Sequence, residues 1–101
     1  MPRNASPGSF DECLRALEHE RRREVLATLL DSEPLRPSVF AADDRERLSL
    51  LHTHLPLLAD MGYIDWDREA GCVGRGPRFD EVATLLGLLR THQDDLPWPV
   101  V

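Results

Sequence analysis

Residues 54–65, HLPLLADMGYID, contain the end of a helix and the start of a β-strand, and this junction decides the fold. The helix carries an apolar stripe at helical spacing, formed by Leu48, Leu51, Leu55 and Leu58. Asp43 or Asp44 is a suitable N-cap, and Gly62 is suited to end the helix because glycine adopts positive φ without strain. Residues 63–67 then alternate apolar or aromatic side chains with acidic ones, which is typical of a half-buried strand.

Two features of this helix predict that it is irregular. Pro56 has no backbone N–H, so the carbonyl of His52 loses its helical partner and we expect a kink near residues 52–56. Leu50 and Leu57 fall roughly opposite the apolar stripe, so burial of one side leaves the other facing outward. Either a short helix and a hairpin cover this second side, or a second subunit does.

The flanking residues predict the remaining elements. Residues 68–71 supply a turn and residues 72–73 a return strand, so a β-hairpin follows the long helix, and apolar spacing predicts a last helix over about 79–92. Ser9 is a plausible N-cap for a first helix of about three turns. A second helix, or a bent continuation of the first, ends before Pro34, and residues 33–44 read as a loop with a helix of one or two turns.

These elements predict a mostly α domain with a small β-hairpin. Residues 1–9 form a flexible N-terminal tail, residues 10–93 the domain and residues 94–101 a C-terminal tail that packs back on the domain or on a partner. A chain of 101 residues supports one core, which excludes a large multi-domain enzyme.

The charge balance is acidic, with a formal net charge of -6, and all 12 basic residues are Arg. This combination is typical of a protein from a saline cytoplasm, with Arg-rich codon usage or an ordinary acidic cytosolic domain as alternatives. Acidity by itself does not support binding to nucleic acid or to anionic membranes. The apolar runs are too short to span a bilayer, and Cys13 and Cys72 show no ligand-like spacing, so we expect a soluble cytoplasmic protein with no membrane partner.

Two parts of the chain resemble a known family. Residues 16–30, with the run RRR at 21–23, resemble the first two helices of ArsR-like winged helix-turn-helix regulators. Residues 54–65 are similar to the end of the recognition helix in that family and its entry to the wing, and most of all to small winged-helix proteins of halophilic archaea. The resemblance implies a winged helix-turn-helix fold and binding to double-stranded DNA in transcriptional control.

The resemblance places the DNA contacts on the long helix and on the hairpin. The candidates on the helix are side chains on its outward face or near its start: Arg45, Arg47, Ser49, His52 and Thr53. The candidates in or after the hairpin, where a wing meets phosphates or a minor groove, are Arg68, Arg75 and Arg78, with a solvated turn as the alternative. The chain has no Asn or Gln near this helix, although those side chains read adenine well.

A protein-interaction or dimerisation module without DNA binding is the alternative function. The acid excess, the second leucine side and the tail favour it, with Leu50, Leu57 and Trp98 as candidate interface residues. A homodimer through the terminal helices is expected for the DNA-binding regulator. Acidic neighbours of residues 21–23 favour a solvated, self-paired helix face over a nucleic-acid patch.

Neither catalysis nor a bound metal is expected. His52 and His54 lie two residues apart and therefore point away from each other on a helix, so they do not share an ion. The sequence GRGP at 74–77 lacks the Lys and the strand-to-helix context of a phosphate loop. We therefore expect no enzyme activity, no metal and no cofactor.

Overall fold

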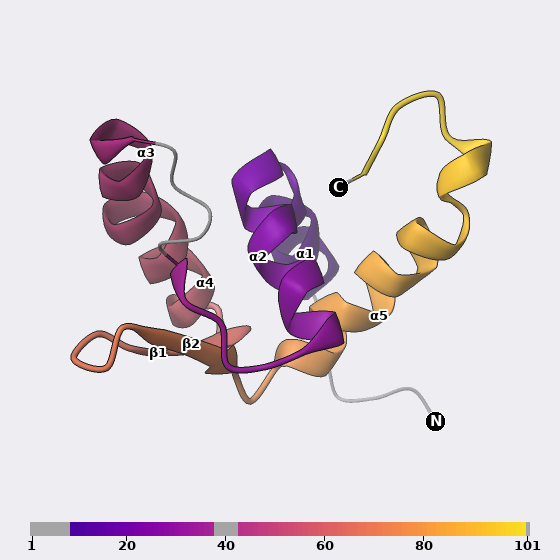
Figure 1. Cartoon of the computed structure of the whole chain (residues 1–101). Coiled ribbons are helices and arrows are strands. Elements are labelled where there is room, and N and C mark those ends of the chain that lie inside the picture. Colours follow the sequence, from indigo (N-terminus) through magenta and orange to yellow (C-terminus); the bar gives the residue numbers. More distant parts are fainter. Residues whose placement is uncertain (1–8, 38–42, 101) are drawn as a thin grey trace.

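The computed structural model describes residues 9–37 and 43–100, which form a mostly helical chain with one two-stranded antiparallel sheet. This confirms the predicted fold class, mostly α with a small β-hairpin. The elements in chain order are α1 (Ser9–Leu17), α2 (Glu20–Asp31), α3 (Asp44–Ser49), the π-helical turn η2 (Leu50–His54), α4 (Leu55–Asp60), β1 (Ile64–Asp67), β2 (Cys72–Arg75), α5 (Phe79–Thr91) and the 3-10 turn η3 (Gln93–Asp95). In Figure 1, α1 and α2 lie between α5 on one side and α3 to α4 on the other.

The helix boundaries agree with most of the sequence signals. α1 and α2 are separate helices, and α1 includes Ser9, which we had placed in the tail. Asp43 caps α3, because its side chain accepts a hydrogen bond from the Glu46 N–H at 2.8 Å. Gly62 has φ +82 and follows the end of α4, as predicted. The expected short helix around residues 39–42 lies outside the described residues.

The predicted irregularity of the long helix is a π-helical turn. The Leu55 N–H donates to the carbonyl of Leu50, five residues back, directly before Pro56 in α4. This turn brings residues five apart onto the same face. Leu50 is therefore buried beside Leu55, with an exposed fraction of 1 %, whereas Leu48 is 51 % exposed. The prediction that Leu48 lies in the buried stripe is wrong, because the π-helical turn changes the repeat on which that prediction was based. Of the two alternatives for Leu50, cover within the chain holds, so Leu50 is not an interface residue.

The hairpin is joined by a third extended segment that the sequence did not predict. β1 and β2 pair in register from Ile64 with Arg75 to Asp67 with Cys72. Leu35 then pairs with Val73 on the other edge of β2 through two backbone hydrogen bonds of 2.9 Å. Leu35 is thereby fixed against the hairpin.

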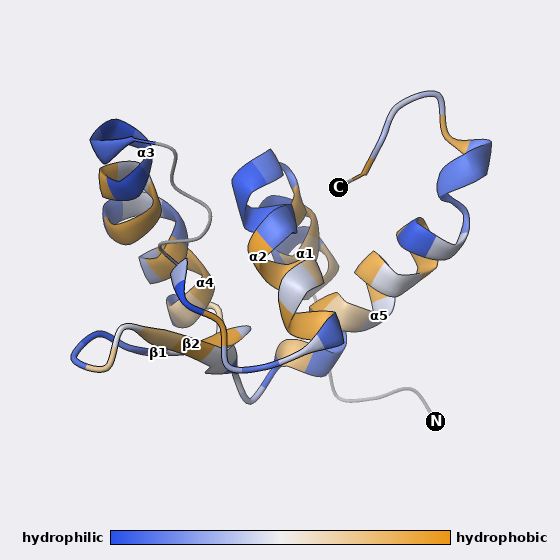
Figure 2. Ribbon diagram, in the orientation of Figure 1, coloured by the Kyte–Doolittle hydropathy of each residue, from blue (hydrophilic) through white to orange (hydrophobic). Residues whose placement is uncertain are grey.

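The core lies where α1, α2, α4 and α5 meet the hairpin. Tyr63 is fully buried at its centre, and its hydroxyl lies 3.3 Å from the Cys13 Sγ. Burial, followed by the contact with Cys13, raises the pKa of Tyr63. In Figure 2 the helices show hydrophobic segments alongside hydrophilic ones, and the first turns of α3 and the hairpin turn are hydrophilic.

The C-terminal segment returns to the domain. Val100 is buried, and the Arg23 Nε donates to the Val100 carbonyl at 2.6 Å. The sequence left open whether this tail packs on the domain or on a partner. Val100 packs on the domain. Trp98 remains 61 % exposed.

Candidate nucleic-acid interface

The arginines at residues 21–23 connect elements of the fold. Arg22 donates to the carbonyls of Arg15 (2.7 Å) and Ala16 (3.1 Å), and Arg23 donates to that of Leu17 (2.7 Å). These carbonyls belong to the last turn of α1, which has no intrahelical donors for them. The pairs predicted along the helix do form, as Arg22 with Glu18 shows, but Arg22 is only 5 % exposed. The prediction of a solvated face is therefore wrong at Arg22.

Arg21 extends this network to α3. Its guanidinium pairs with Glu24 on α2 and with Glu46 on α3, each at 3.1 Å. The Arg21–Glu24 pair has the i, i+3 spacing expected for a self-paired helix face. Arg21, Arg22 and Arg23 therefore connect α1, α2 and α3 within the fold.

Arg22 also contacts a buried histidine. Its Nη1 lies 3.3 Å from the His54 Nδ1, and a guanidinium only donates, so Nδ1 accepts and the proton is assigned to Nε2. That Nε2 lies 3.5 Å from the Ser49 Oγ. Burial, then the nearby His19, Arg22 and Arg21, lower the pKa of His54 to about 4. His54 is therefore a neutral link between α2 and the long helix.

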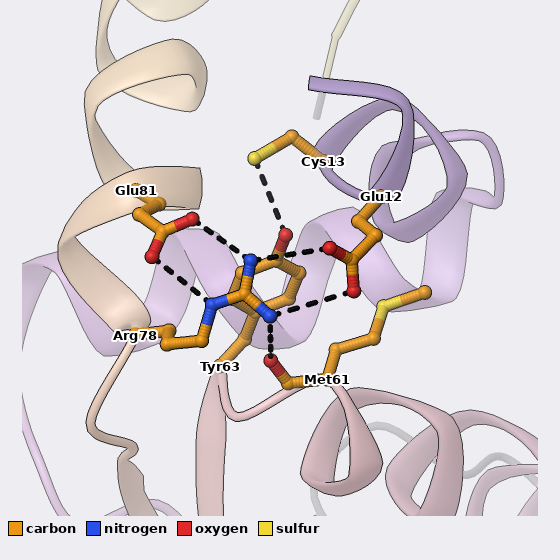
Figure 3. A network of polar contacts seen from close by, with 6 residues as sticks. All are labelled: Glu12, Cys13, Met61, Tyr63, Arg78 and Glu81. Atoms are coloured by element: carbon orange, nitrogen blue, oxygen red, sulfur yellow. Dashed lines mark hydrogen bonds and ion pairs between the residues drawn. The ribbon is translucent and has the colours of Figure 1, made fainter. Parts of the chain in front are cut away.

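Arg78 is held within the fold, as Figure 3 shows. Its guanidinium donates to Glu81 on α5 at 2.9 and 3.0 Å, to Glu12 on α1 at 3.2 and 3.4 Å, and to the Met61 carbonyl at 3.1 Å. These two carboxylates raise the pKa of Arg78. We withdraw Arg78 from the candidate DNA contacts because two carboxylates already surround its charge.

Arg75 is also engaged within the fold. Its Nε donates to the Leu29 carbonyl at 2.7 Å and its Nη2 to the Leu30 carbonyl at 3.4 Å, at the C-terminal end of α2. Its backbone N–H donates to Glu33 at 2.8 Å. Arg75 therefore ties the hairpin to α2, and we withdraw it from the candidate interface because its guanidinium already donates to two carbonyls.

A second set of arginines, which we call the exposed arginine group, lies on α3, in the hairpin turn and directly after Leu35. It consists of Arg36, Arg45, Arg47 and Arg68. Within the described residues, Arg45 forms no ion pair, and Arg47 forms one with Asp44 at 3.5 Å between two exposed side chains. The Arg68 guanidinium lies 4.3 Å from the centre of the Trp66 ring. Arg36 donates to the Ala70 carbonyl at 3.2 Å.

Three members of the group line one pocket of about 340 Å³, namely Arg36, Arg47 and Arg68. Arg36 is not among the predicted site residues, because residues 33–44 read only as a loop. Arg36 lies at the hairpin turn because the adjacent Leu35 pairs with Val73 of β2, and these two residues are far apart in the sequence.

The remaining predicted DNA contacts lie on the surface of α3 and η2. Ser49, His52 and Thr53 are exposed, as are Arg45 and Arg47. Some nearby acidic groups are already engaged: Asp43 caps α3, and Glu46 pairs with Arg21. The five predicted helix residues therefore share the accessibility that contact with DNA requires.

The predicted interface residues have different environments. Leu50 is buried within the chain, Leu57 is half-buried against the core, and Trp98 is exposed. The terminal helices carry further exposed apolar side chains, Phe10 and Leu14 on α1 and Leu88 on α5.

The described residues contain no group of three or more His, Cys, Asp or Glu side chains placed to hold a metal ion. Cys13 and Cys72 are both free thiols. In the same part of the chain, no helix has the length and apolar character needed to cross a membrane.

Comparison with known proteins leaves the structure as the basis for a functional assignment. No protein-family model matches the chain, and neither a curated protein nor a solved structure matches it. The fold and the surface together define a small α+β domain whose exposed arginine group surrounds the start of a long helix and the adjacent hairpin turn.

Proposed function

We propose that this chain is a winged-helix protein that binds double-stranded DNA and regulates transcription as a homodimer. The order of elements supports the proposal: α2, the Leu35 segment, the long helix from α3 to α4, and the β1–β2 hairpin. In a winged helix-turn-helix the long helix enters the major groove and the hairpin approaches the adjacent backbone or minor groove.

The observation that carries this proposal is the position of the exposed arginine group. In a chain of net charge -6, four arginines lie on the two elements that would face DNA, or beside them, and each makes at most one surface contact within the described residues. Contacts to phosphates supply most of the affinity and orientation of DNA-binding proteins. Arg45, Arg47 and Arg68 are therefore our proposed phosphate contacts, with Arg36 beside them.

The side chains on the reading helix determine what kind of specificity to expect. Ser49, His52 and Thr53 are the exposed polar groups next to the arginines, and they make fewer paired contacts with base edges than Asn or Gln would. We therefore propose that phosphate contacts dominate the affinity.

Exposed apolar side chains on the terminal helices support the homodimer. Phe10, Leu14 and Leu88 are 62 %, 47 % and 56 % exposed. A symmetric dimer built on α1 and α5 would bury such residues and present two reading helices to one duplex.

The test is a titration with duplex DNA at several salt concentrations. For a DNA-binding protein, the logarithm of the affinity falls linearly with that of the salt concentration, and Arg47→Ala or Arg68→Ala each reduces the slope by about one. Arg90→Ala is the matched control, because Arg90 lies on α5 and forms one exposed ion pair with Asp31 at 3.5 Å. Absence of binding at every salt concentration would overturn the proposal.

A protein-interaction module without DNA binding is the competing proposal, and the exposed Trp98 favours it. Large aromatic side chains contribute strongly to protein interfaces. The same DNA titration separates the two, because an interaction module shows no salt-dependent binding to duplex DNA.

A further inference from the structure

A pocket lies between the start of the long helix and the hairpin. Its volume of about 340 Å³ is within the range of small-molecule sites. Apolar side chains from both elements form part of its wall: Leu50 is buried, and Leu51 and Trp66 are half-buried. Arg36, Arg47 and Arg68 are the exposed part of the lining.

The three arginines come from three separate segments and converge without a buried counter-charge among the described residues. Arg36 is bonded to the hairpin turn through the Ala70 carbonyl, and Arg68 stacks on Trp66, so both guanidinium groups are positioned before any ligand arrives. Within the described residues, the one ion pair of this trio joins Arg47 to Asp44 at 3.5 Å, and the Asp44 side chain is 92 % exposed. Like charges brought together in this way repel one another, and an anion in the pocket relieves that repulsion.

The lining also restricts the chemistry of the anion. Guanidinium groups match the planar, two-oxygen shape of a carboxylate and also bind phosphate. The described side chains that line the pocket, however, supply donors and apolar surface but no acceptor. A ligand rich in N–H donors, such as a nucleobase, would leave those donors without side-chain partners, which costs affinity.

We propose that this pocket binds a small organic carboxylate with an aryl or branched alkyl body. The carboxylate pairs with Arg36 and Arg68, with Arg47 adding attraction, and the apolar body packs against Leu51 and Trp66. The site shares Arg47 and Arg68 with the proposed DNA contacts, but a carboxylate binds there whether or not DNA is present, so this binding is measured without DNA.

The test uses 3-phenylpropionate as the probe and Trp66 fluorescence as the readout. The chain has two Trp, so Trp98→Phe at the exposed position leaves Trp66 as the only indole. We expect a saturable change in fluorescence with 3-phenylpropionate. The neutral 3-phenylpropionamide and the small anions acetate and phosphate should bind at least about tenfold more weakly, since each lacks either the charge or the apolar body.

Substitutions locate the binding to this pocket. In the Trp98→Phe protein, Arg36→Gln and Arg68→Gln should each weaken 3-phenylpropionate about tenfold, and Arg90→Gln should leave it unchanged. Thermal unfolding verifies that each variant is folded, and the comparison of the four ligands needs none of these arginine variants. No saturable response, equal binding of acetate, phosphate or the amide, or equal weakening by Arg90→Gln would overturn the proposal. No DNA is present, so failure here is distinct from failure of the DNA titration.

Discussion

The described arginines include two groups that differ in what their guanidinium groups contact. Arg22 and Arg75 donate to carbonyls at the C-terminal ends of α1 and α2, and Arg78 joins carboxylates of α1 and α5. The exposed arginine group, in contrast, lies around α3 and the hairpin turn with at most one surface contact each.

The comparison explains how a chain without lysine uses its positive charge. A guanidinium group has five donors in a rigid plane, so one side chain satisfies several acceptors at once, whereas an ammonium group acts as a point charge. Arg22 reaches two carbonyls, one carboxylate and one histidine in this way.

The most severe test of this comparison is Arg22→Ala. The substitution leaves the end of α1 and His54 without their donor in a buried position, so we expect a loss of about 3 kcal/mol in the free energy of unfolding, measured by urea denaturation. Arg45→Ala is the matched control, because Arg45 is exposed on α3 and its loss should cost less than about 0.5 kcal/mol. Similar losses for both variants would remove the distinction between the two groups of arginines.

The pH dependence of stability tests the link between Arg22 and His54. The pKa of His54 is lowered to about 4 in the folded chain, so between pH 6.5 and 4 the unfolded chain binds more protons. Stability should therefore fall as the pH is lowered through this window, by up to about 3 kcal/mol from this group.

Two variants isolate the contribution of His54. His54→Gln retains an acceptor for Arg22 and should show a smaller loss of stability between pH 6.5 and 4. His52→Gln, at an exposed position, should behave as the unaltered chain does. Identical pH profiles for His54→Gln and the unaltered chain would show that a neutral, buried His54 does not contribute to the pH dependence of stability.

The smallest effect concerns Arg68 in the hairpin turn and Arg78 after the hairpin. Arg78→Ala should lower the free energy of unfolding by about 1–2 kcal/mol, because its ion pairs are one-third exposed and therefore partly screened. Arg68→Ala should change stability by less than about 0.5 kcal/mol but weaken binding to DNA. Thermal unfolding measures the loss of stability in both variants. A greater loss for Arg68→Ala than for Arg78→Ala would contradict the assignment of Arg78 to the fold and of Arg68 to the surface.

Local sequence patterns predicted the helices and the hairpin well because those signals extend over only a few neighbouring residues. Gly62 and the alternation in residues 63–67 marked the junction of helix and strand correctly. The π-helical turn was not visible, since periodicity assumes one repeat throughout, and this error reversed the environments of Leu48 and Leu50.

The partners of the arginines could not be predicted for a related reason. Arg75 and Leu29 are 46 positions apart, and Arg78 and Glu12 are 66 apart, so no spacing in the sequence connects them. Arg45, Arg47 and Arg68 could be proposed because a surface position needs only a helix face or a turn. Arg36 required the pairing of Leu35 with Val73, which brings two loops together.

The π-helical turn changes the direction in which the side chains of α3 point relative to those of α4. Each residue of an α-helix advances about 100° around the axis, so the single residue accommodated at Leu50–His54 rotates α3 by about that angle relative to α4. α4 is fixed by the core, and the rotation therefore sets the direction in which Arg47 points. Deletion of one residue from this turn would change almost nothing in composition, yet it would turn Arg47 out of the pocket that it lines together with Arg36 and Arg68.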